Sequence, residues 1–192
     1  RQPARPFAFD HLVVSPRDMR RKLNALIADE ARRARQGEEA YILAKVNHIT
    51  DAKLIRRLYA AAAVGVRLRL LVRGNCSIVA SAHDRGRIEI RGIIDRYLEH
   101  SRILIFGHGG DERIYIGSAD WMTRNLDNRV EAYAPVYDEA VRRELRRIVD
   151  EGLADNVAAR VVDGTGDNLL YDDGRPPQQR LYEHYRAESG EK

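Results

Sequence analysis

Hydrophobic positions in the first third of the chain alternate between two spacings, which predict helices and strands in turn. From Met19 to Ala34 they recur every three or four residues, the period of an amphipathic helix, and Gly37 follows at the expected end. Ser15, Pro16 and Asp18 stand before this run and are typical of a helix start. We therefore expect a helix that the Ser15 hydroxyl caps and Gly37 ends.

A strand, a second helix and a second strand are expected next. Tyr41–Val46 is a mostly apolar run of strand length. Thr50 and Asp51 begin a helix that Gly65 ends, with an apolar face expected to carry Ile55, Leu58, Tyr59 and Ala62. Residues 66–73 alternate apolar side chains with arginine, which predicts a strand ending at Arg73.

The second half of the chain is dominated by strand signals. Further strands are predicted at residues 88–91, 102–106, 113–117 and 129–134, with a glycine-rich hairpin loop at 107–110. Asp138 starts a third helix, whose expected buried positions are Val141, Leu145, Ile148 and Val149. Its arginines at 142, 143, 146 and 147 are interpreted as a solvated face rather than a binding stripe. This order predicts an α/β fold with a mixed β-sheet flanked by helices.

We expect three segments along the chain. Residues 1–10 are interpreted as a linker or the cut end of a longer polypeptide, since they lack periodicity and the chain does not begin with methionine. Residues 11–162 form one domain. Residues 163–192 hold an exposed loop, rich in Gly, Asp and Pro up to residue 179, and one or two turns of helix near 181–186.

Composition narrows the class of protein without choosing a function. The 192 residues carry a net charge of +4, and 44% are hydrophobic, as in one soluble globular domain. The single cysteine, Cys76, cannot form an internal bridge, and no apolar run approaches membrane length, so a reducing cytosol is expected. Only four of the 33 basic residues are lysines. A general bias towards arginine explains this, yet individual arginines remain candidates for binding phosphate.

One stretch carries residues suited to phosphoryl chemistry. His100 and Arg102 stand at the entrance of a predicted strand, and Gly117 and Ser118 follow the hairpin partner of that strand. At one sheet edge they would supply a nucleophile or proton donor, a cation, and backbone and hydroxyl donors. The alternative is a histidine merely hydrogen-bonded at a strand end. The spacing of the other histidines predicts no zinc site.

These residues resemble a half-site of the phospholipase D superfamily. Its pattern is His-x-Lys, a later Asp, then Gly-Ser-x-Asn. Here Arg102 stands in place of lysine, Asp111 is displaced from the expected spacing, and Asp120 stands where asparagine would be. The resemblance implies a phospholipase D-like domain.

A closer resemblance is to the C-terminal domain of bacterial polyphosphate kinase, the long-chain, histidine-phosphorylating family. It runs from about Phe7 to Arg160 and is strongest at Ser118-Ala-Asp-Trp-Met-Thr-Arg-Asn-Leu-Asp127, which Arg129 follows. The segment Cys76–Arg87 is shorter than in the family. The resemblance implies reversible transfer of the terminal phosphate of ATP to inorganic polyphosphate through a phosphohistidine. That histidine lies in the preceding domain, which this sequence lacks.

The resemblance also implies roles for single residues. His100 is the second required histidine, acting as a general acid or base or as a transition-state donor. Nucleotide and phosphate contacts are expected from Arg73 and Arg129, and in second rank from Arg102, Arg124, Lys45, Asn47 and Ser118. Magnesium is the expected cofactor, with its ligands mainly in the missing upstream domain.

The implied partners are ATP or ADP, inorganic polyphosphate and the upstream domains of the same enzyme, without nucleic acid. The full-length enzyme is expected to be a homo-oligomer in the cytoplasm or peripheral at the inner membrane, and this fragment is expected to be inactive alone. Two alternatives stay open. One is a phospholipase D-type phosphodiesterase or nuclease that acts as a homodimer, and the other is a basic anion-binding module.

Overall fold

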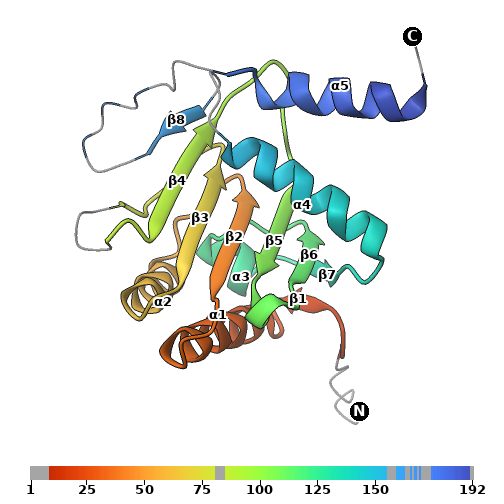
Figure 1. Cartoon of the computed structure of the whole chain (residues 1–192). Coiled ribbons are helices and arrows are strands. Elements are labelled where there is room, and N and C mark those ends of the chain that lie inside the picture. The colour runs from red at the N-terminus through yellow and green to blue at the C-terminus, as the bar shows by residue number, and fades with distance from the viewer. Residues whose placement is uncertain are drawn as a thin grey trace.

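A single mixed β-sheet organises the molecule. The computed structural model describes residues 9–80, 85–154, 159–162, 165, 167, 169 and 174–190, and within these residues the sheet has eight strands (Figure 1). They are β1 (Val13–Ser15), β2 (Tyr41–Val46), β3 (Arg67–Val72), β4 (Ile88–Ile93), β5 (Arg102–Phe106), β6 (Arg113–Gly117), β7 (Glu131–Pro135) and β8 (Ala159–Val161). Their order across the sheet is β1-β7-β6-β5-β2-β3-β4-β8.

Helices cover both faces of the sheet. The five α-helices in the described part of the chain are α1 (Met19–Arg35), α2 (Ala52–Ala63), α3 (Thr123–Asp127), α4 (Glu139–Leu153) and α5 (Pro177–Ser189). The larger core joins one sheet face to α1, α2 and α3, while a smaller core joins the other face to α4. Helix α5 lies against α4 (Figure 1). Among the described helices, none has the length and apolar character needed to span a membrane.

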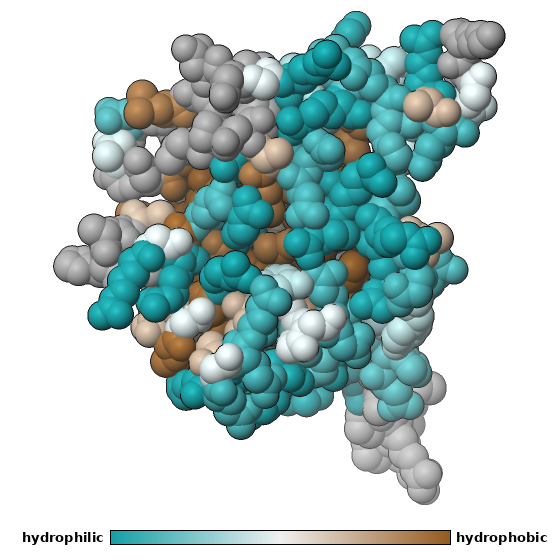
Figure 2. Space-filling view, in the orientation of Figure 1, coloured by the Kyte–Doolittle hydropathy of each residue, from teal (hydrophilic) through white to brown (hydrophobic). Residues whose placement is uncertain are grey.

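Burial of alternate strand faces separates the two cores. Leu68 and Leu70 of β3 face the larger core, and Leu71 faces the smaller one beside Val149 of α4. Each large apolar side chain that is fully buried contributes about 1.5–3 kcal/mol to folding. On the face viewed in Figure 2, hydrophilic residues cover much of α4 and α5, and hydrophobic residues show mainly over the middle of the sheet.

Strand direction brings six strand ends to one edge. β2, β3 and β4 are parallel, whereas β5 is antiparallel to β2, β6 to β5 and β7 to β6. The carboxyl ends of β2, β3, β4 and β6 therefore lie at the same edge as the amino ends of β5 and β7. Loops at such an edge are a common location for ligand sites in α/β proteins.

The predicted fold class and the longer elements are confirmed. The predicted helices correspond to α1, α2 and α4, and the glycine-rich hairpin loop between β5 and β6 is confirmed. The short elements β1, α3 and β8 were not predicted, because a strand of three residues and a helix of five span too few repeats of their periods. Residues 129 and 130 precede β7 rather than beginning it.

The expected cap of α1 is wrong. Ser15 belongs to β1, and its buried hydroxyl has no hydrogen-bond partner among the described residues. The N-cap position is Asp18, whose carboxylate accepts a hydrogen bond from the backbone of Val14 at 3.1 Å instead of capping α1. The side chain thus stabilises the turn that enters the helix rather than its first amides.

Other local expectations also need correction. Tyr59 and Val141, predicted on buried helix faces, are 37% and 45% exposed. Arg142 and Arg146 are not simply solvated, because Arg142 donates to the carbonyl of Glu112, just before β6, and Arg146 pairs with its carboxylate. Helix α5 has 13 residues, so it is longer than the one or two turns expected near 181–186. Residues 1–8 and most of the loop at 163–173 lie outside the described residues.

A buried ion pair joins α1, α2 and α3 on the larger core. Asp51 caps α2 by accepting a hydrogen bond from the Leu54 amide at 2.8 Å, and both its oxygens accept from Arg20 at 2.8 Å. Arg20 also binds Asp127 at 2.6 Å, next to the end of α3. The hydrogen bonds from Arg20 hold the pKa of Asp51 far below its usual range. The pair fixes where the segment before α3 lies.

Removing Asp51 should therefore destabilise the fold strongly. We expect Asp51→Ala to lower the free energy of unfolding by about 3–5 kcal/mol, because the buried Arg20 pair and the helix cap are both lost. Asp127→Ala should lower it by about 1 kcal/mol or less, since that carboxylate is partly exposed. Urea unfolding followed by the fluorescence of Trp121 measures both. Equal effects of the two variants would contradict this assignment.

Candidate functional site

The edge where six strand ends meet carries an open hollow of about 700 Å³. It is lined by residues from the strand ends at this edge, from the loops beside them and from α3, namely His48, His100, Arg102, Ser118, Asp120, Arg124, Asn125, Arg129, Val130 and Glu131. Five of these were expected from the sequence as site residues: His100, Arg102, Ser118, Arg124 and Arg129. The predicted convergence of the histidine, the arginine and the glycine-serine turn at one edge is confirmed.

The carboxylate of Asp120 connects the strands around the hollow. Asp120 is 5% exposed, and its Oδ1 accepts hydrogen bonds from the backbone of Asn47 at 2.8 Å and from its side-chain amide at 3.1 Å. Arg102 donates through Nε and Nη2 to the two oxygens, each at 3.1 Å. Burial alone would raise the pKa of Asp120, but hydrogen bonds from Arg102 and Asn47 outweigh it and lower the pKa.

Arg102 in turn contacts His100. Its Nη1 donates to the His100 carbonyl at 3.1 Å and lies 3.1 Å from the Nδ1 atom of the ring. The Nη2 atom of Arg102 also lies 3.4 Å from the Nε2 atom of the ring, so both imidazole nitrogens are near the guanidinium. His100 itself is exposed at the rim of the hollow. The imidazole is thus oriented from one side and open to a ligand on the other.

The same network extends to Arg73 at the end of β3. Arg73 Nε donates to Asn47 Oδ1 at 3.0 Å, while the amide group of Asn47 donates to Asp120. A continuous series of side chains therefore runs from Arg73 through Asn47, Asp120 and Arg102 to His100. Arg73 and Asn47 line a second, smaller pocket of about 230 Å³, beside the hollow rather than in it.

Lys45 lies in that smaller pocket with its charge already paired. Its Nζ is 2.8 Å from a carboxylate oxygen of Glu99 and donates to Ser101 Oγ at 2.8 Å. The residue is 8% exposed. Its predicted role in binding phosphate stays a prediction, because the ammonium is engaged within the chain.

The turn after β6 is packed closely against β7. A Cβ atom at Gly117 would lie 2.3 Å from the carbonyl oxygen of Ala132 and 2.4 Å from the ring of Tyr133, so only glycine fits there. The Ser118 hydroxyl donates to the carboxylate of Glu131, which Asn125 also binds at 2.8 Å. Ser118 is therefore held in place by Glu131.

Two arginines at the hollow remain free to meet an anion. Arg124 and Arg129 are exposed, and neither pairs with a carboxylate in the described part of the chain. Arg73 likewise has no carboxylate partner among the described residues, since its partner is the neutral Asn47. Three uncompensated guanidinium groups around one edge favour a ligand with several negatively charged oxygens.

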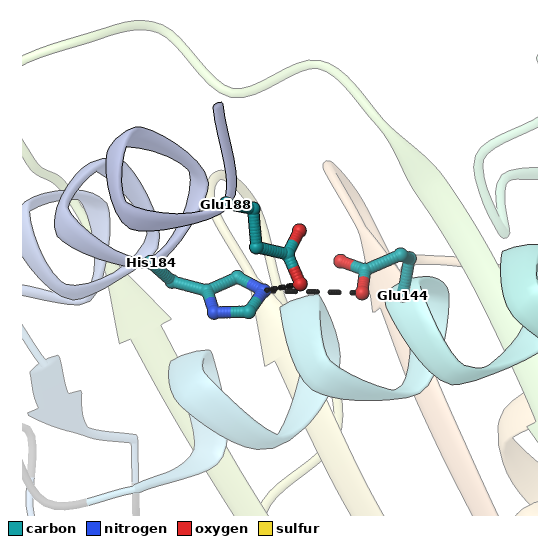
Figure 3. Close-up of side chains that lie close together, drawn as sticks. All are labelled: Glu144, His184 and Glu188. Atoms are coloured by element: carbon teal, nitrogen blue, oxygen red, sulfur yellow. Dashed lines mark ion pairs between the residues drawn. The ribbon is translucent and has the colours of Figure 1, made fainter. Parts of the chain in front are cut away.

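A different cluster offers the atoms of a metal site but not its chemistry. Among the described residues, Glu144 of α4 and His184 and Glu188 of α5 have ligand atoms within 4.8 Å of one another (Figure 3). However, the Nη1 of Arg147 lies 3.4 Å from His184 Nδ1, and a guanidinium only donates. Nδ1 is then the acceptor, and the proton sits on Nε2, which faces the carboxylates. This cluster is a polar tie between two helices.

Sequence reasoning missed several residues of the hollow. His48, Asn125 and Glu131 line it without having been proposed as site residues. Asp120 was noticed only as a replacement for asparagine, although its position after a glycine-serine turn was the available signal. Trp121, next to it, is fully buried in the larger core.

Comparison with protein families identifies relatives for most of the chain. The family model described as polyphosphate kinase C-terminal domain 2 matches residues 12–180. The polyphosphate kinase of Vibrio cholerae is 41% identical over 173 residues, which are 90% of this chain and 25% of that protein. The enzyme of Escherichia coli is 43% identical over 162 residues, covering 84% and 24%. The chain thus spans about a quarter of these curated relatives.

Solved structures agree on the fold. The polyphosphate kinase from Porphyromonas gingivalis superposes with a TM-score of 0.92 at 35% identity, covering 98% of this chain and 30% of that one. Nuc from Salmonella typhimurium, a phospholipase D family member, gives a TM-score of 0.54 at 15% identity, covering 80% and 97%. The second likeness is one of fold, and it confirms the expected phospholipase D-like architecture.

The role of Asp120 predicts how acid affects the fold. Its folded-state pKa lies below the ordinary value of about 3.9, so its ionised form stabilises the fold above about pH 4. That contribution is lost as the pH falls through the lowered pKa. We expect Asp120→Asn to lower the free energy of unfolding by about 2 kcal/mol at pH 7 and by progressively less below pH 4. Urea unfolding at several pH values measures the difference.

Asp111 provides the matched control. Its side chain is 86% exposed at the opposite end of the β5–β6 hairpin. Asp111→Asn should change stability little at any pH. A pH-independent difference between wild type and Asp120→Asn would show that the Asp120 carboxylate does not carry this charge interaction.

Proposed function

The chain belongs to the polyphosphate kinase family, and we propose that it supplies one half of the active site of an ATP:polyphosphate phosphotransferase. The reaction is ATP plus a polyphosphate chain giving ADP and a chain longer by one phosphate, and it is reversible. The observation that carries the proposal is that Arg124 and Arg129, without carboxylate partners among the described residues, share a hollow with an oriented His100, while Arg73 lies beside it with only the neutral Asn47 as partner.

Phosphoryl transfer needs positive groups fixed before the reaction begins. In the transition state, negative charge spreads over the equatorial oxygens of the transferred group, and preorganised donors stabilise it. Arg73 and Arg129 are proposed to bind nucleotide or polyphosphate oxygens, with Arg124 beside them. Asn47, through its hydrogen bond to Arg73, is proposed to hold that guanidinium at the edge.

His100 is proposed to move or hold a proton at the transferred phosphate. Both of its ring nitrogens lie near Arg102, and the imidazole is exposed at the rim of the hollow, where a ligand can reach it. The nitrogens of Arg102 already bind Asp120 and His100, which favours orientation of His100 over direct contact with phosphate. Ser118, held by Glu131, is proposed to add a hydroxyl at the same hollow.

The site is proposed to be completed by the preceding domain of the full-length enzyme. That domain is expected to carry the histidine that becomes phosphorylated. Ile94, Leu98 and Val130 support this, because they are 68%, 74% and 87% exposed next to the pocket and the hollow, where a covering domain would bury them. The oligomeric state and the location of the whole protein stay predictions.

Magnesium is proposed to be held mainly by the preceding domain and the phosphates. The carboxylates at this hollow are poorly suited to hold it, because Asp120 is engaged by Arg102 and Asn47 and Glu131 by Ser118 and Asn125. Open carboxylate oxygens are what Mg²⁺ requires. The described residues of the hollow thus do not form a magnesium site.

The first test is ATP formation from ADP and polyphosphate. We expect none from this chain alone and activity when it is mixed with, or fused to, the missing upstream portion. His100→Ala should abolish the activity of the complemented sample. Asp111→Asn, at the far end of the hairpin, should leave it unchanged.

Other outcomes point to the alternatives. Hydrolysis of a model phosphodiester by this chain alone, lost in His100→Ala, would favour a homodimeric phosphodiesterase. Affinity for nucleic acid that falls steeply with salt and is unchanged by His100→Ala would favour a basic binding module. Polyphosphate synthesis by the isolated chain would contradict the split site.

The unpaired arginines generate a second prediction. In the full-length enzyme, Arg129→Gln should lower kcat/KM by about 10- to 100-fold, since one charge-assisted hydrogen bond contributes about 1.5–3 kcal/mol. Steady-state kinetics with ADP and polyphosphate measure it. Arg143→Gln is the control, because Arg143 is exposed on α4 away from the hollow. If both variants lose kcat/KM equally, Arg129 acts only through the net positive charge of the protein and not through a specific hydrogen bond to the substrate.

A further inference from the structure

The segment that leads into His100 is held in place by α5, which comes some 80 residues later in the sequence. Gln178 Oε1 accepts a hydrogen bond from the Tyr97 amide at 2.8 Å, and its Nε2 donates to the Tyr97 carbonyl at 2.7 Å. The Gln178 side chain thus makes, with the backbone of Tyr97, the two hydrogen bonds that a residue of a neighbouring strand would make. The backbone amide of Gln178 also donates to Asp95 at 3.3 Å.

A second set of contacts links Gln178 to the residues on either side of His100. Gln178 Nε2 also donates to Glu99 Oε1 at 3.0 Å, and the other oxygen of Glu99 pairs with Lys45 at 2.8 Å. Lys45 donates as well to Ser101 at 2.8 Å. The residues on either side of His100 are therefore bound to the same buried lysine of β2. The backbone of His100 is held between two anchors.

Apolar packing does little to hold this segment. Ile94, Tyr97 and Leu98 are 68%, 65% and 74% exposed, and residues 94–101 lie between β4 and β5 outside any regular element. The hydrogen bonds and the ion pair must therefore supply most of the constraint. Loss of the Gln178 amide would leave the segment with few other fixed contacts.

Helix α5 is itself fixed to the rest of the fold. Arg180 pairs with the Glu151 carboxylate at 2.6 Å and donates to the Glu151 carbonyl at 2.8 Å. Helix α5 also contacts α4 through His184, which points between Glu144 of α4 and Glu188 of α5 (Figure 3). Since α4 is packed on the smaller core, Gln178 is positioned by the folded domain and not by a free tail.

We propose that Gln178 is a positioning residue for His100, acting through Tyr97, Glu99 and Lys45. This inference rests on the proposed function, because it assumes that the place of His100 governs the rate of phosphoryl transfer. In this account the C-terminal helix belongs to the active site without touching the substrate. Lys45 and Glu99 share the same role, as an ion pair that braces the segment.

Gln178→Ala in the full-length enzyme tests the proposal, with Gln179→Ala as its matched control. Gln179 is the next residue of the same helix, and its side chain donates to Glu183 at 3.0 Å; among the described residues it has no hydrogen bond to the 95–101 segment. We expect Gln178→Ala to lower kcat about 10- to 100-fold with less than a twofold change in KM for ADP, as displacement of a reacting group does. Gln179→Ala should change neither.

Hydrogen–deuterium exchange supplies the structural readout. Gln178→Ala should speed exchange of the Tyr97 amide and of residues 95–101, while α4 keeps its protection. If Gln178→Ala also lowers the protection of α4, the test is made with Glu99→Gln instead. That substitution weakens the ion pair with Lys45 and leaves α5 in place. Unchanged exchange at 95–101, or faster exchange with an unchanged kcat, would overturn the proposal.

Failure of the proposed function and failure of the positioning role give different results. If the wild-type enzyme forms no ATP from ADP and polyphosphate, the proposed function fails, while the exchange data still decide whether Gln178 holds the segment. If the wild type is active and His100→Ala is inactive, but Gln178→Ala keeps the wild-type kcat, only the positioning role fails.

Discussion

The functional edge depends on one buried charge. Asp120 is almost fully enclosed, and a carboxylate in that environment is tolerated only when donors surround it. Those donors come from the end of β2, through Asn47, and the start of β5, through Arg102. Meeting the requirement of Asp120 therefore aligns two strands and the turn after β6. Each of its partners also contacts a residue proposed for the chemistry.

This arrangement divides the polar residues of the edge into two groups. Lys45, Arg102 and Ser118 are engaged within the chain and hold the shape of the site. Arg124 and Arg129 face the hollow without a carboxylate partner in the described part of the chain. Residue type alone does not separate these groups, because arginine occurs in both. The groups differ in whether a carboxylate of the chain lies close enough to pair with the side chain.

Much of the fold followed from periodicity, since the helices of 12 to 17 residues and the strands of five or six carry enough repeats to be recognised. The three-residue strands β1 and β8 do not, and their pairing is decided by tertiary contact. Ser15 shows the same limit, because a hydroxyl that could cap a helix was instead buried in a strand.

Convergence of His100, Arg102 and Ser118 was predictable from strand order. The links through Gln178 and Glu131 were not, because hydrogen bonds between residues distant in sequence leave no local pattern.

The open form of the hollow gives a physical reason to expect low activity from this half of the proposed site alone. Water reaches Arg124 and Arg129 freely, and at high dielectric a guanidinium attracts a phosphate oxygen with only about 1 kcal/mol at 4 Å. A domain seated over Val130 and Leu98 would exclude that water and strengthen each charge interaction without moving any residue of this chain. The hydrogen bonds of Asp120 with Asn47 and Arg102 are already formed without such a domain, so its binding would not have to order them. Under the proposed function, the second half of the site would add the phosphorylated group and exclude water, while this half would contribute fixed charges and an oriented histidine.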